Sequence, residues 1–427
     1  MNFDEALAYL DAHINLEARS GVYEGLSLDA MADIARVWGD PQEAYPVIHI
    51  TGTNGKGSTA RMATRLLMAH GLKVGTYTSP HLERYNERIR IDDAEVDDQR
   101  FADIIEQLSR FEPMLGQRPS HFECLTACAL ALFAEEAVDV AVIEVGVMGR
   151  YDATNIVTAD VAVITNIGRD HTTAQGDWRR EIAEEKAGII KSTSTLVLGE
   201  KDPALREVFL GEGPAAALVA GEDFELEANR LAVGGRLIDL RTPYQRLTEL
   251  FVPLHGAHQG VNASLALMAT SAFFGRALDP EVAAEGLAST EVAGRFEVLR
   301  RNPLVIIDGA HNPDGAEAAA AVLEEGFAVQ GRRVLVCGML EGRDPQLMLT
   351  ALRADRFDTV ITCTPTSPRA LPADELALAA ASLGIACRVA STIEQAIGWA
   401  LDAATPSDLI FVTGSLYLVG AARSLLR

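Results

Sequence analysis

Short apolar runs rich in β-branched residues alternate with segments of helical periodicity along the first part of the chain. The run "PVIHITG" leads into a glycine-rich loop, and "STARMATRLLMAHG" follows with the spacing of a helix that Gly71 ends. Further strand-like runs are "KVGTYTS", "DVAVIEVG", "DVAVITNIG" and "TLVLGE", some of them separated by helical stretches. This alternation predicts an α/β domain built on a mainly parallel sheet.

A second series of the same kind begins after the segment "STEVAGRFEVLRRNP". Its strand-like runs are "PLVIIDGAHNP", "RRVLVCGML", "DTVITCTPT", "ACRVAS" and "DLIFVTGS". They predict another doubly wound sheet, so we expect one domain over residues 1–294 and a smaller one over 295–427. Residues 221–250 carry short alternating runs, which predict a β-rich insertion before the end of the first domain.

Composition narrows the class of protein. The 427 residues carry a formal charge of −23 and no Lys/Arg-rich run, which argues against nonspecific nucleic-acid binding. The sequence has no apolar run of about 18 residues and no signal peptide, so we expect no membrane span and a cytoplasmic protein. Five scattered cysteines fit a reducing compartment. Cys124 and Cys128 near His121 suggest a metal site, but helical apolar spacing favours a buried helix there.

The run "IHITGTNGKGST", residues 48–59, has the setting of a phosphate-binding loop between a strand and a helix. Its spacing departs from the usual G-x-x-x-x-G-K-[ST] form, because Gly57 separates Lys56 from the hydroxyl of Ser58. Backbone N–H groups at a helix start and a lysine cation suit phosphate oxygens, and Ser58 or Thr59 can reach Mg²⁺. A glycine-rich turn with no ligand is the alternative.

Other polar residues also lie near strand ends. Glu144 places a carboxylate among the apolar residues of "VIEVG", which is costly unless a metal or a buried salt bridge partners it. His171, taken alone, fits a structural histidine, and Lys186 in "EIAEEKAGIIK" fits a solvated helix lysine beside glutamates. The run "DGAHNP" holds Asp308 and His311 at a strand end, or is simply a turn between strand and helix.

Ten motifs occur in order along almost the whole chain. After the loop come "TSPHLERYNERI", "IEVGVMGRYDATN", "NIGRDH", "EIAEEKAGIIK", "LHGAHQGVNASLA", "GRFEV", "DGAHNP", "SPRALP" and "GSLYLVG". This set resembles the folylpolyglutamate synthase and dihydrofolate synthase branch of the Mur-ligase superfamily. A glycine between the lysine and the hydroxyl is the rule in that branch, so the resemblance explains the unusual loop spacing.

The resemblance implies an α/β fold with a P-loop-containing Mur-ligase central domain and a smaller Rossmann-like C-terminal domain. It implies an ATP-dependent acid–amino-acid ligase of folate biosynthesis, which adds L-glutamate to dihydropteroate, to tetrahydrofolate (poly)glutamates, or to both. The reaction would pass through an acyl phosphate. The expected ligands are ATP, Mg²⁺, L-glutamate and dihydropteroate or folate, with no nucleic-acid or membrane partner. The resemblance also implies a monomer.

The resemblance assigns roles to individual residues. The ATP site would comprise Thr53, Asn54, Gly55, Lys56, Gly57, Ser58, Asn262, Arg295 and Asp308. Mg²⁺ would be held by Ser79, Glu144, His171 and a carbamylated Lys186. His311 and Ser415 would hold glutamate, and Arg84, Arg150 and Asp152 are candidates for the pterin–folate pocket. The catalytic set would be Lys56, Lys186, His171, Asp308 and His311.

The chain departs from the family pattern at two places. Met148 stands where the family usually has a glycine, which predicts a change in substrate preference more than in catalysis. Gly342 and Arg343 stand where an aspartate and a lysine are usual. Three alternatives stay open: a folylpolyglutamate synthase only, another Mur-type amino-acid ligase, and a nucleotide-switch protein that uses the loop for regulation alone.

Overall fold

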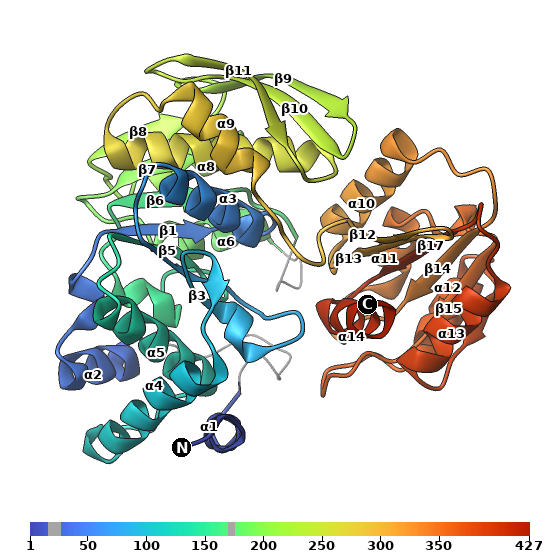
Figure 1. Cartoon of the computed structure of the whole chain (residues 1–427), viewed down its shortest axis with the longest axis horizontal. Helices are drawn as coiled ribbons and strands as arrows, with labels where there is room; N and C mark the ends of the chain where they lie inside the picture. The colour runs from blue at the N-terminus through green and yellow to red at the C-terminus, as the bar shows by residue number, and fades with distance from the viewer. Residues whose placement is uncertain (16–26, 170–175) are drawn as a thin grey trace.

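The computed structural model describes residues 1–15, 27–169 and 176–427, and it builds the chain on two large sheets that lie side by side (Figure 1). The first sheet has eight strands in the order β4-β3-β2-β5-β1-β6-β7-β8. Its strands are β1 (Val47–Thr51), β2 (Val74–Tyr77), β3 (Ile89–Ile91), β4 (Ala94–Glu95), β5 (Val140–Glu144), β6 (Val161–Ile164), β7 (Thr195–Leu198) and β8 (Ala216–Val219). Only the β2–β3 and β3–β4 pairs are antiparallel.

Helices cover both faces of this sheet, which is why β1 and β5 are buried along their whole length. The helices of this first unit are α1 (Phe3–Asp11), α2 (Asp29–Trp38), α3 (Lys56–Ala69), α4 (Asp98–Phe111), α5 (His121–Glu135), α6 (Trp178–Ala187), α7 (Pro203–Leu210), α8 (Ala257–Phe274) and α9 (Pro280–Ala288). Short 3₁₀ turns are η1 (Pro41–Glu43), η2 (Tyr85–Arg88), η3 (Glu112–Met114) and η4 (Ala153–Ile156). One apolar core joins α3, α8 and α9 to the sheet, and another joins α1, α4 and α5 to it.

The predicted β-rich insertion is confirmed as a separate antiparallel sheet of three strands. It consists of β9 (Glu225–Ala232), β10 (Gly235–Arg241) and β11 (Arg246–Val252), in the order β11-β10-β9. Its inner residues, among them Ile238 and Leu247, join the apolar core of α3 and α8. The insertion therefore forms an outer layer over these helices (Figure 1).

The second unit is a smaller α/β layer with strand order β12-β13-β17-β14-β15-β16. Its strands are β12 (Glu297–Arg301), β13 (Leu304–Asp308), β14 (Arg333–Cys337), β15 (Thr359–Thr362), β16 (Cys387–Val389) and β17 (Leu409–Thr413), and only the β12–β13 pair is antiparallel. Its helices are α10 (Pro313–Gly326), α11 (Pro345–Ala351), α12 (Ala373–Ser382), α13 (Ile393–Ala403) and α14 (Leu416–Leu426), with one 3₁₀ turn, η5 (Ala354–Arg356). Helices α10 to α12 pack on one face, and α13 and α14 on the other. The predicted fold class is confirmed.

The predicted buried helix is also confirmed, as α5. Ser120 and Glu123 form a capping box at its start, and both Cys124 and Cys128 are buried among apolar side chains. Within the described residues, no cluster of three or more His, Cys, Asp or Glu side chains is arranged to hold a metal ion. The burial of both thiols in an apolar helix supports the interpretation of these cysteines as core residues.

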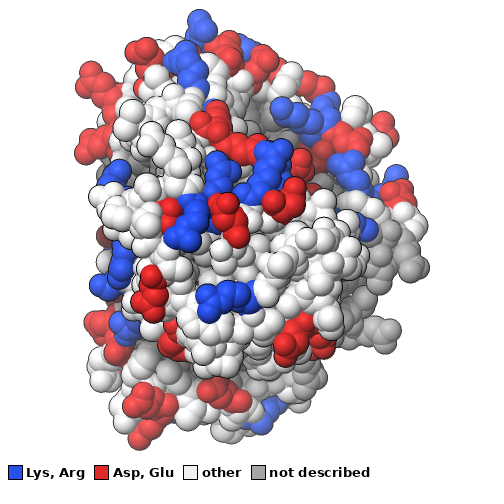
Figure 2. Space-filling view, turned by 90° about the vertical axis from the view of Figure 1, so that its right-hand side faces the viewer, with Lys and Arg blue, Asp and Glu red and all other residues white. Residues whose placement is uncertain are grey.

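Two further observations concern the helices and the charged side chains of the surface. No helix of the described ranges is both long and apolar enough to cross a membrane. On the face shown in Figure 2, Lys and Arg side chains lie intermixed with Asp and Glu side chains. That mixture accords with the absence of a Lys/Arg-rich run in the sequence.

Candidate active site

The glycine-rich loop joins β1 to α3, as the sequence predicts. Gly55 precedes the helix with φ of 84°, a left-handed conformation that favours glycine. A Cβ atom at Gly55 would lie 2.3 Å from Oδ1 of Asn262 on α8. The loop therefore needs a glycine here, both for its backbone and for its close contact with Asn262.

Asn166, directly after β6, holds the loop in place. Its backbone oxygen accepts from Thr53 N–H at 3.0 Å, and its side-chain Oδ1 accepts from Asn54 N–H at 3.1 Å. Its Nδ2 donates to the Asn54 carbonyl at 3.0 Å. Asn166 was not among the residues predicted from the sequence, although its place at the end of a strand-like run was a usable signal.

Glu144, Ser79 and Gly57 meet beside the loop. Glu144 ends β5, and its Oε2 accepts from the backbone N–H of Ser79, which follows β2, at 3.2 Å. A Cβ atom at Gly57 would lie 3.3 Å from this same oxygen. The glycine inserted after Lys56 therefore leaves room at a carboxylate, which gives the unusual loop spacing a physical reason.

The Glu144 carboxyl group is buried, which makes its ionised form costly. Burial raises its pKa above the usual range, while the charges of Lys56, Arg295 and Arg88 act to lower it. None of the ion pairs seen among the described residues involves this carboxylate, and the Lys56 charge is the largest of those that lower its pKa. A hard carboxylate oxygen with space beside it, next to the Ser79 hydroxyl position, fits a divalent cation. His171, the third expected ligand, lies outside the described residues.

Lys186 reaches the loop from α6. It is buried on α6, and its Nζ donates to the Gly52 carbonyl at 2.9 Å. Nζ of Lys56 donates to this carbonyl too, at 3.1 Å. A small cavity lined by Lys186 and Lys56 shares Lys56, Gly146 and Val147 with a larger cavity of about 450 Å³. Residues of both units line this larger cavity, which is the main cavity of the site.

Met148 and Gly149 bring their loop against α6. Met148 has φ of 62°, so it holds a conformation that favours glycine. Its side chain packs on the α6–α7 core and lines the small cavity beside Lys186. A Cβ atom at Gly149 would lie 3.0 Å from Cα of Lys186. The departure at Met148 therefore changes the surroundings of Lys186; its expected effect on substrate preference stays a prediction.

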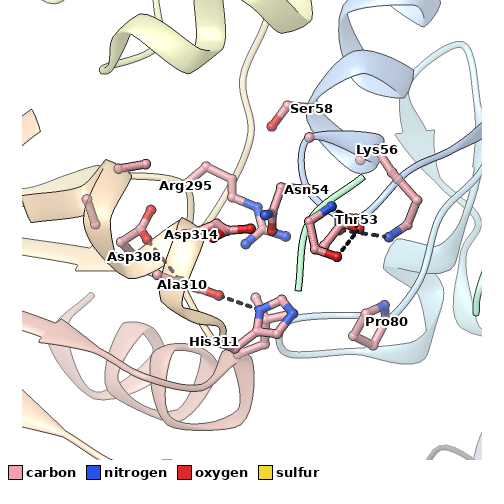
Figure 3. A pocket seen from close by; sticks show the side chains of 18 of the residues that line it. Thr53, Asn54, Lys56, Ser58, Pro80, Arg295, Asp308, Ala310, His311 and Asp314 are labelled. Atoms are coloured by element: carbon pink, nitrogen blue, oxygen red, sulfur yellow. Dashed lines mark hydrogen bonds between the residues drawn. The ribbon is translucent and has the colours of Figure 1, made fainter. Parts of the chain in front are cut away.

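The second unit supplies the opposite wall, with Arg295 and Asp308 facing the loop across the cavity (Figure 3). The Asp308 carboxylate accepts from Phe296 N–H at 2.8 Å and from Ala310 N–H at 2.9 Å. Burial raises the pKa of Asp308, and the nearby Arg295 charge opposes this rise. A Cβ atom at Gly309 would lie 2.6 Å from Nη1 of Arg295, so the guanidinium rests on this turn.

His311 and Ser415 complete this wall. His311 Nδ1 lies 2.9 Å from the Gly309 carbonyl, and Ser415 is the buried N-cap of α14. Both line the same cavity of about 450 Å³ as Lys56 and Glu144. The structure thus brings together one group of expected residues from both units: Thr53, Asn54, Gly55, Lys56, Gly57, Ser58, Ser79, Glu144, Asn262, Arg295, Asp308, His311 and Ser415.

Two further residues of the second unit touch the loops of the first unit. Asn312, which caps α10, donates from Nδ2 to Oδ1 of Asn54 at 2.9 Å. Asp314 accepts from Arg169 N–H at 3.2 Å. Asn312 belongs to the "DGAHNP" motif but was not among the predicted site residues, because an asparagine at this place is typical of an ordinary helix cap.

The three candidates for the pterin–folate pocket do not line one common cavity among those described. Arg84 is paired with Asp98 and lines a separate cavity between the two units. Arg150 donates to the Glu184 carbonyl at 2.9 Å, away from the cavities described here. Asp152 is buried and accepts from Val147 N–H at 2.8 Å, which orders its own loop. Their assignment as substrate contacts remains a prediction.

The second departure from the family pattern has a clear location. Gly342 has φ of 80°, which glycine adopts without strain. Arg343 lines the main cavity together with Arg369, which the sequence analysis did not single out. The change therefore places a guanidinium in the cavity wall.

Comparison with known proteins agrees with this architecture. The Mur ligase middle domain matches residues 50–270, and the Mur ligase glutamate ligase domain matches residues 294–416. The dihydrofolate synthase/folylpolyglutamate synthase of Mycobacterium tuberculosis is 39% identical, over 93% of this chain and 90% of that protein.

Two solved structures extend the similarity. The Mycobacterium tuberculosis folylpolyglutamate synthase complexed with ADP has a TM-score of 0.93 and 37% identity, and the match covers 99% of this chain and 98% of that one. A bifunctional folylpolyglutamate synthase/dihydrofolate synthase with Mn, AMPPNP and L-glutamate bound has a TM-score of 0.86 and 30% identity, over 100% of this chain and 98% of that one. The chain therefore belongs to the dihydrofolate synthase/folylpolyglutamate synthase family of Mur ligases.

Proposed function

We propose that this protein is an ATP-dependent ligase that adds L-glutamate to the carboxylate of dihydropteroate, of folates, or of both. The supporting observation is one cavity in which Lys56 and Glu144 of the first unit face Arg295 and His311 of the second. An ATP-dependent amide ligase needs a phosphate site beside a site for the amine. A nucleotide switch would not need the second wall, so this arrangement favours the ligase.

The reaction has two steps. The substrate carboxylate attacks the γ-phosphorus of ATP, which breaks the bond to ADP and forms an acyl phosphate. The glutamate amine then attacks the acyl carbon, loses a proton, and phosphate leaves. In both steps a nucleophile approaches a group that carries or develops negative charge. Protein cations and N–H donors that contact the phosphoryl group therefore supply most of the stabilisation of the transition state.

Each wall has a task in these steps. The N–H groups from Gly55 to Ser58, at the start of α3, bind phosphate oxygens, and Lys56 adds a point charge. Arg295 approaches the phosphates from the other wall with a planar fork of donors. His311 and Ser415 bind the incoming glutamate close to the acyl group.

A divalent metal, Mg²⁺ in this proposal, would be held by Glu144 and Ser79. It would screen the negative charge between the attacking carboxylate and the phosphate. The family member that was solved with Mn bound supports the use of a divalent metal. We also propose His171 as a ligand.

Carbamylation of Lys186 belongs to the same proposal. Lys56 and Lys186 donate to one carbonyl oxygen, so two ammonium groups would repel each other there. A carbamate keeps one N–H for the Gly52 carbonyl and replaces the positive charge with a negative one. The buried amine must lose its proton before it can react with CO₂.

The remaining assignments are proposals too. We place the functional boundary between residues 294 and 295, because β9–β11 and α9 pack with the first sheet and β12 opens the second. We also propose a monomeric enzyme, as the family resemblance implies.

Glutamate-dependent ADP release tests the proposal. The protein should release ADP with ATP, L-glutamate and either dihydropteroate or tetrahydrofolate, and release should stop when glutamate is left out. Activity with tetrahydrofolate alone would identify a folylpolyglutamate synthase only. Release with neither pteridine would contradict the proposal and favour another Mur-type ligase or a switch.

A further inference from the structure

The loop that follows β2 crosses from the first unit to the second. Figure 1 shows it projecting towards α14. Leu82 of this loop packs into the apolar core formed by α13, α14 and their sheet. A Cβ atom at Gly420 on α14 would lie 2.0 Å from the Leu82 carbonyl oxygen, and one at Gly294 would lie 3.0 Å from its Cδ2. Two glycines therefore form the socket that receives Leu82.

An ion-pair cluster holds the loop beside this socket. Glu83 accepts from Nη1 of Arg423 and, at 2.5 Å, from Oγ of Ser424, both on α14. Arg423 also donates from Nε to Oε2 of Glu297 on β12 at 3.0 Å. The Arg423 side chain is only 11% exposed, so solvent screens this cluster less than an ordinary surface pair.

The loop is stiff between this cluster and the active site. The Glu87 carboxylate accepts from the backbone N–H groups of Leu82, Glu83 and Arg84 at 2.7–2.8 Å. Ser79 lies only three residues before Leu82 and contacts Glu144. A displacement of Leu82 and Glu83 would therefore be passed on to Ser79.

We infer that Glu83 and Arg423 are positioning residues that couple the place of the second unit to the place of Ser79. When the second unit packs on Leu82, the same contact holds Ser79 beside Glu144. Ser79 and Glu144 are then in place to bind the metal and its nucleotide. The inference rests on the proposed function for its kinetic readout. Neither residue touches a reacting group, since both act through the loop.

The first test is a double-mutant cycle of Glu83→Gln and Arg423→Met. Each variant should raise the KM for ATP about fivefold, as expected for one partly buried ion pair, with a smaller change in the KM for glutamate. The KM for ATP of the double variant should be no higher than that of the more impaired single variant. Arg427→Met is the matched control, because Arg427 also pairs with Glu297 but does not contact Glu83, and it should keep wild-type constants.

Gly420→Ala separates coupling from folding. Alanine is the better helix former, so α14 should stay intact, while the added methyl group blocks the docking of Leu82. This variant should raise the KM for ATP, and its radius of gyration by small-angle scattering should exceed that of wild type with ATP bound. Wild-type ATP affinity and unchanged scattering in Gly420→Ala, or additive effects in the cycle, would overturn the inference. ATP binding and scattering need no turnover, so an inactive wild type would contradict the proposed function alone.

Discussion

Lys56 and Lys186 donate to the same backbone oxygen, the carbonyl of Gly52 in the nucleotide loop, and line the same small cavity. Two like charges beside one acceptor repel each other, and a carbamate on Lys186 would turn this repulsion into attraction. The pair therefore links the loop lysine to the proposed modification.

Lys186→Ala should lower turnover by at least about 100-fold, the scale for removing one preorganised charged group. Acetate could partly restore activity by occupying the vacated space. Lys186→Arg should not restore it, because guanidinium cannot form a carbamate. A ¹³C NMR signal for the carbamate should appear in wild type under ¹³CO₂ and be absent in Lys186→Arg. Near-wild-type turnover of Lys186→Arg would show that only a cation is needed.

Lys56→Ala should lose roughly 2–4 kcal/mol of transition-state stabilisation, which is about 30- to 1000-fold in turnover. Its thermal unfolding should stay close to wild type, because the side chain lies on the loop and is only partly buried. The check is kcat at saturating ATP together with a melting curve. Turnover within about threefold of wild type would remove Lys56 from the phosphate site.

Glu144→Gln should stabilise the ligand-free protein while it impairs catalysis. Burial raises the pKa of Glu144 in the folded state, so the folded protein binds this proton more tightly than the unfolded chain. The free energy of unfolding therefore falls as the pH rises from the unfolded pKa through the folded one, and glutamine removes that loss. Turnover should fall about 100-fold.

Denaturant unfolding over this pH range checks the stability change. Glu136→Gln is the control of opposite sign, because its hydrogen bond with Lys73 lowers the pKa of Glu136. At pH values above this range, the free energy of unfolding of Glu136→Gln should be no higher than that of wild type. The variant should keep its activity. If the free energy of unfolding of Glu144→Gln depended on pH as it does in wild type, the charge of the buried carboxylate would already be stabilised by its surroundings.

Gly57→Ala tests the glycine inserted in the loop. Alanine stabilises a helix by roughly 0.5–1 kcal/mol relative to glycine, so folding should not suffer. The new Cβ atom crowds the Glu144 carboxylate at 3.3 Å, so kcat/KM for ATP should fall roughly tenfold, about 1.4 kcal/mol. Gly398→Ala on α13 is the control, since its Cβ atom would meet nothing within 4 Å. Equal kinetics in both variants would show that the space at Glu144 is not used.

Asn312→Ser should weaken ATP binding without unfolding α10. Serine keeps the helix cap that Asn312 provides but cannot reach Asn54. The loss of one hydrogen bond, about 1 kcal/mol, predicts a rise of about fivefold in the KM for ATP. Asn2→Ser at the start of α1 is the matched control, because Asn2 caps a helix through the same kind of bond. A fall in stability larger than that of Asn2→Ser, with no change in KM, would assign Asn312 to the cap alone.

Local pattern determined the two α/β sheets, the three-stranded insertion and the strand–loop–helix around Lys56. It could do so because periodicity, glycine placement and helix caps act over a few residues. It also put Glu144 and Asp308 at strand ends, where parallel sheets build their sites. The family resemblance added the roles of these residues.

Only the tertiary structure decided which side chains meet. Asn312 reaches Asn54 across 258 residues, and Lys186 reaches Gly52 across 134, through strand orders that do not follow the chain. The same crossing of chain segments places Arg84 in a cavity that Arg150 does not line, and it brings Gly57 against Glu144. These contacts depend on how two sheets and their loops pack in three dimensions, and no short-range pattern encodes that packing.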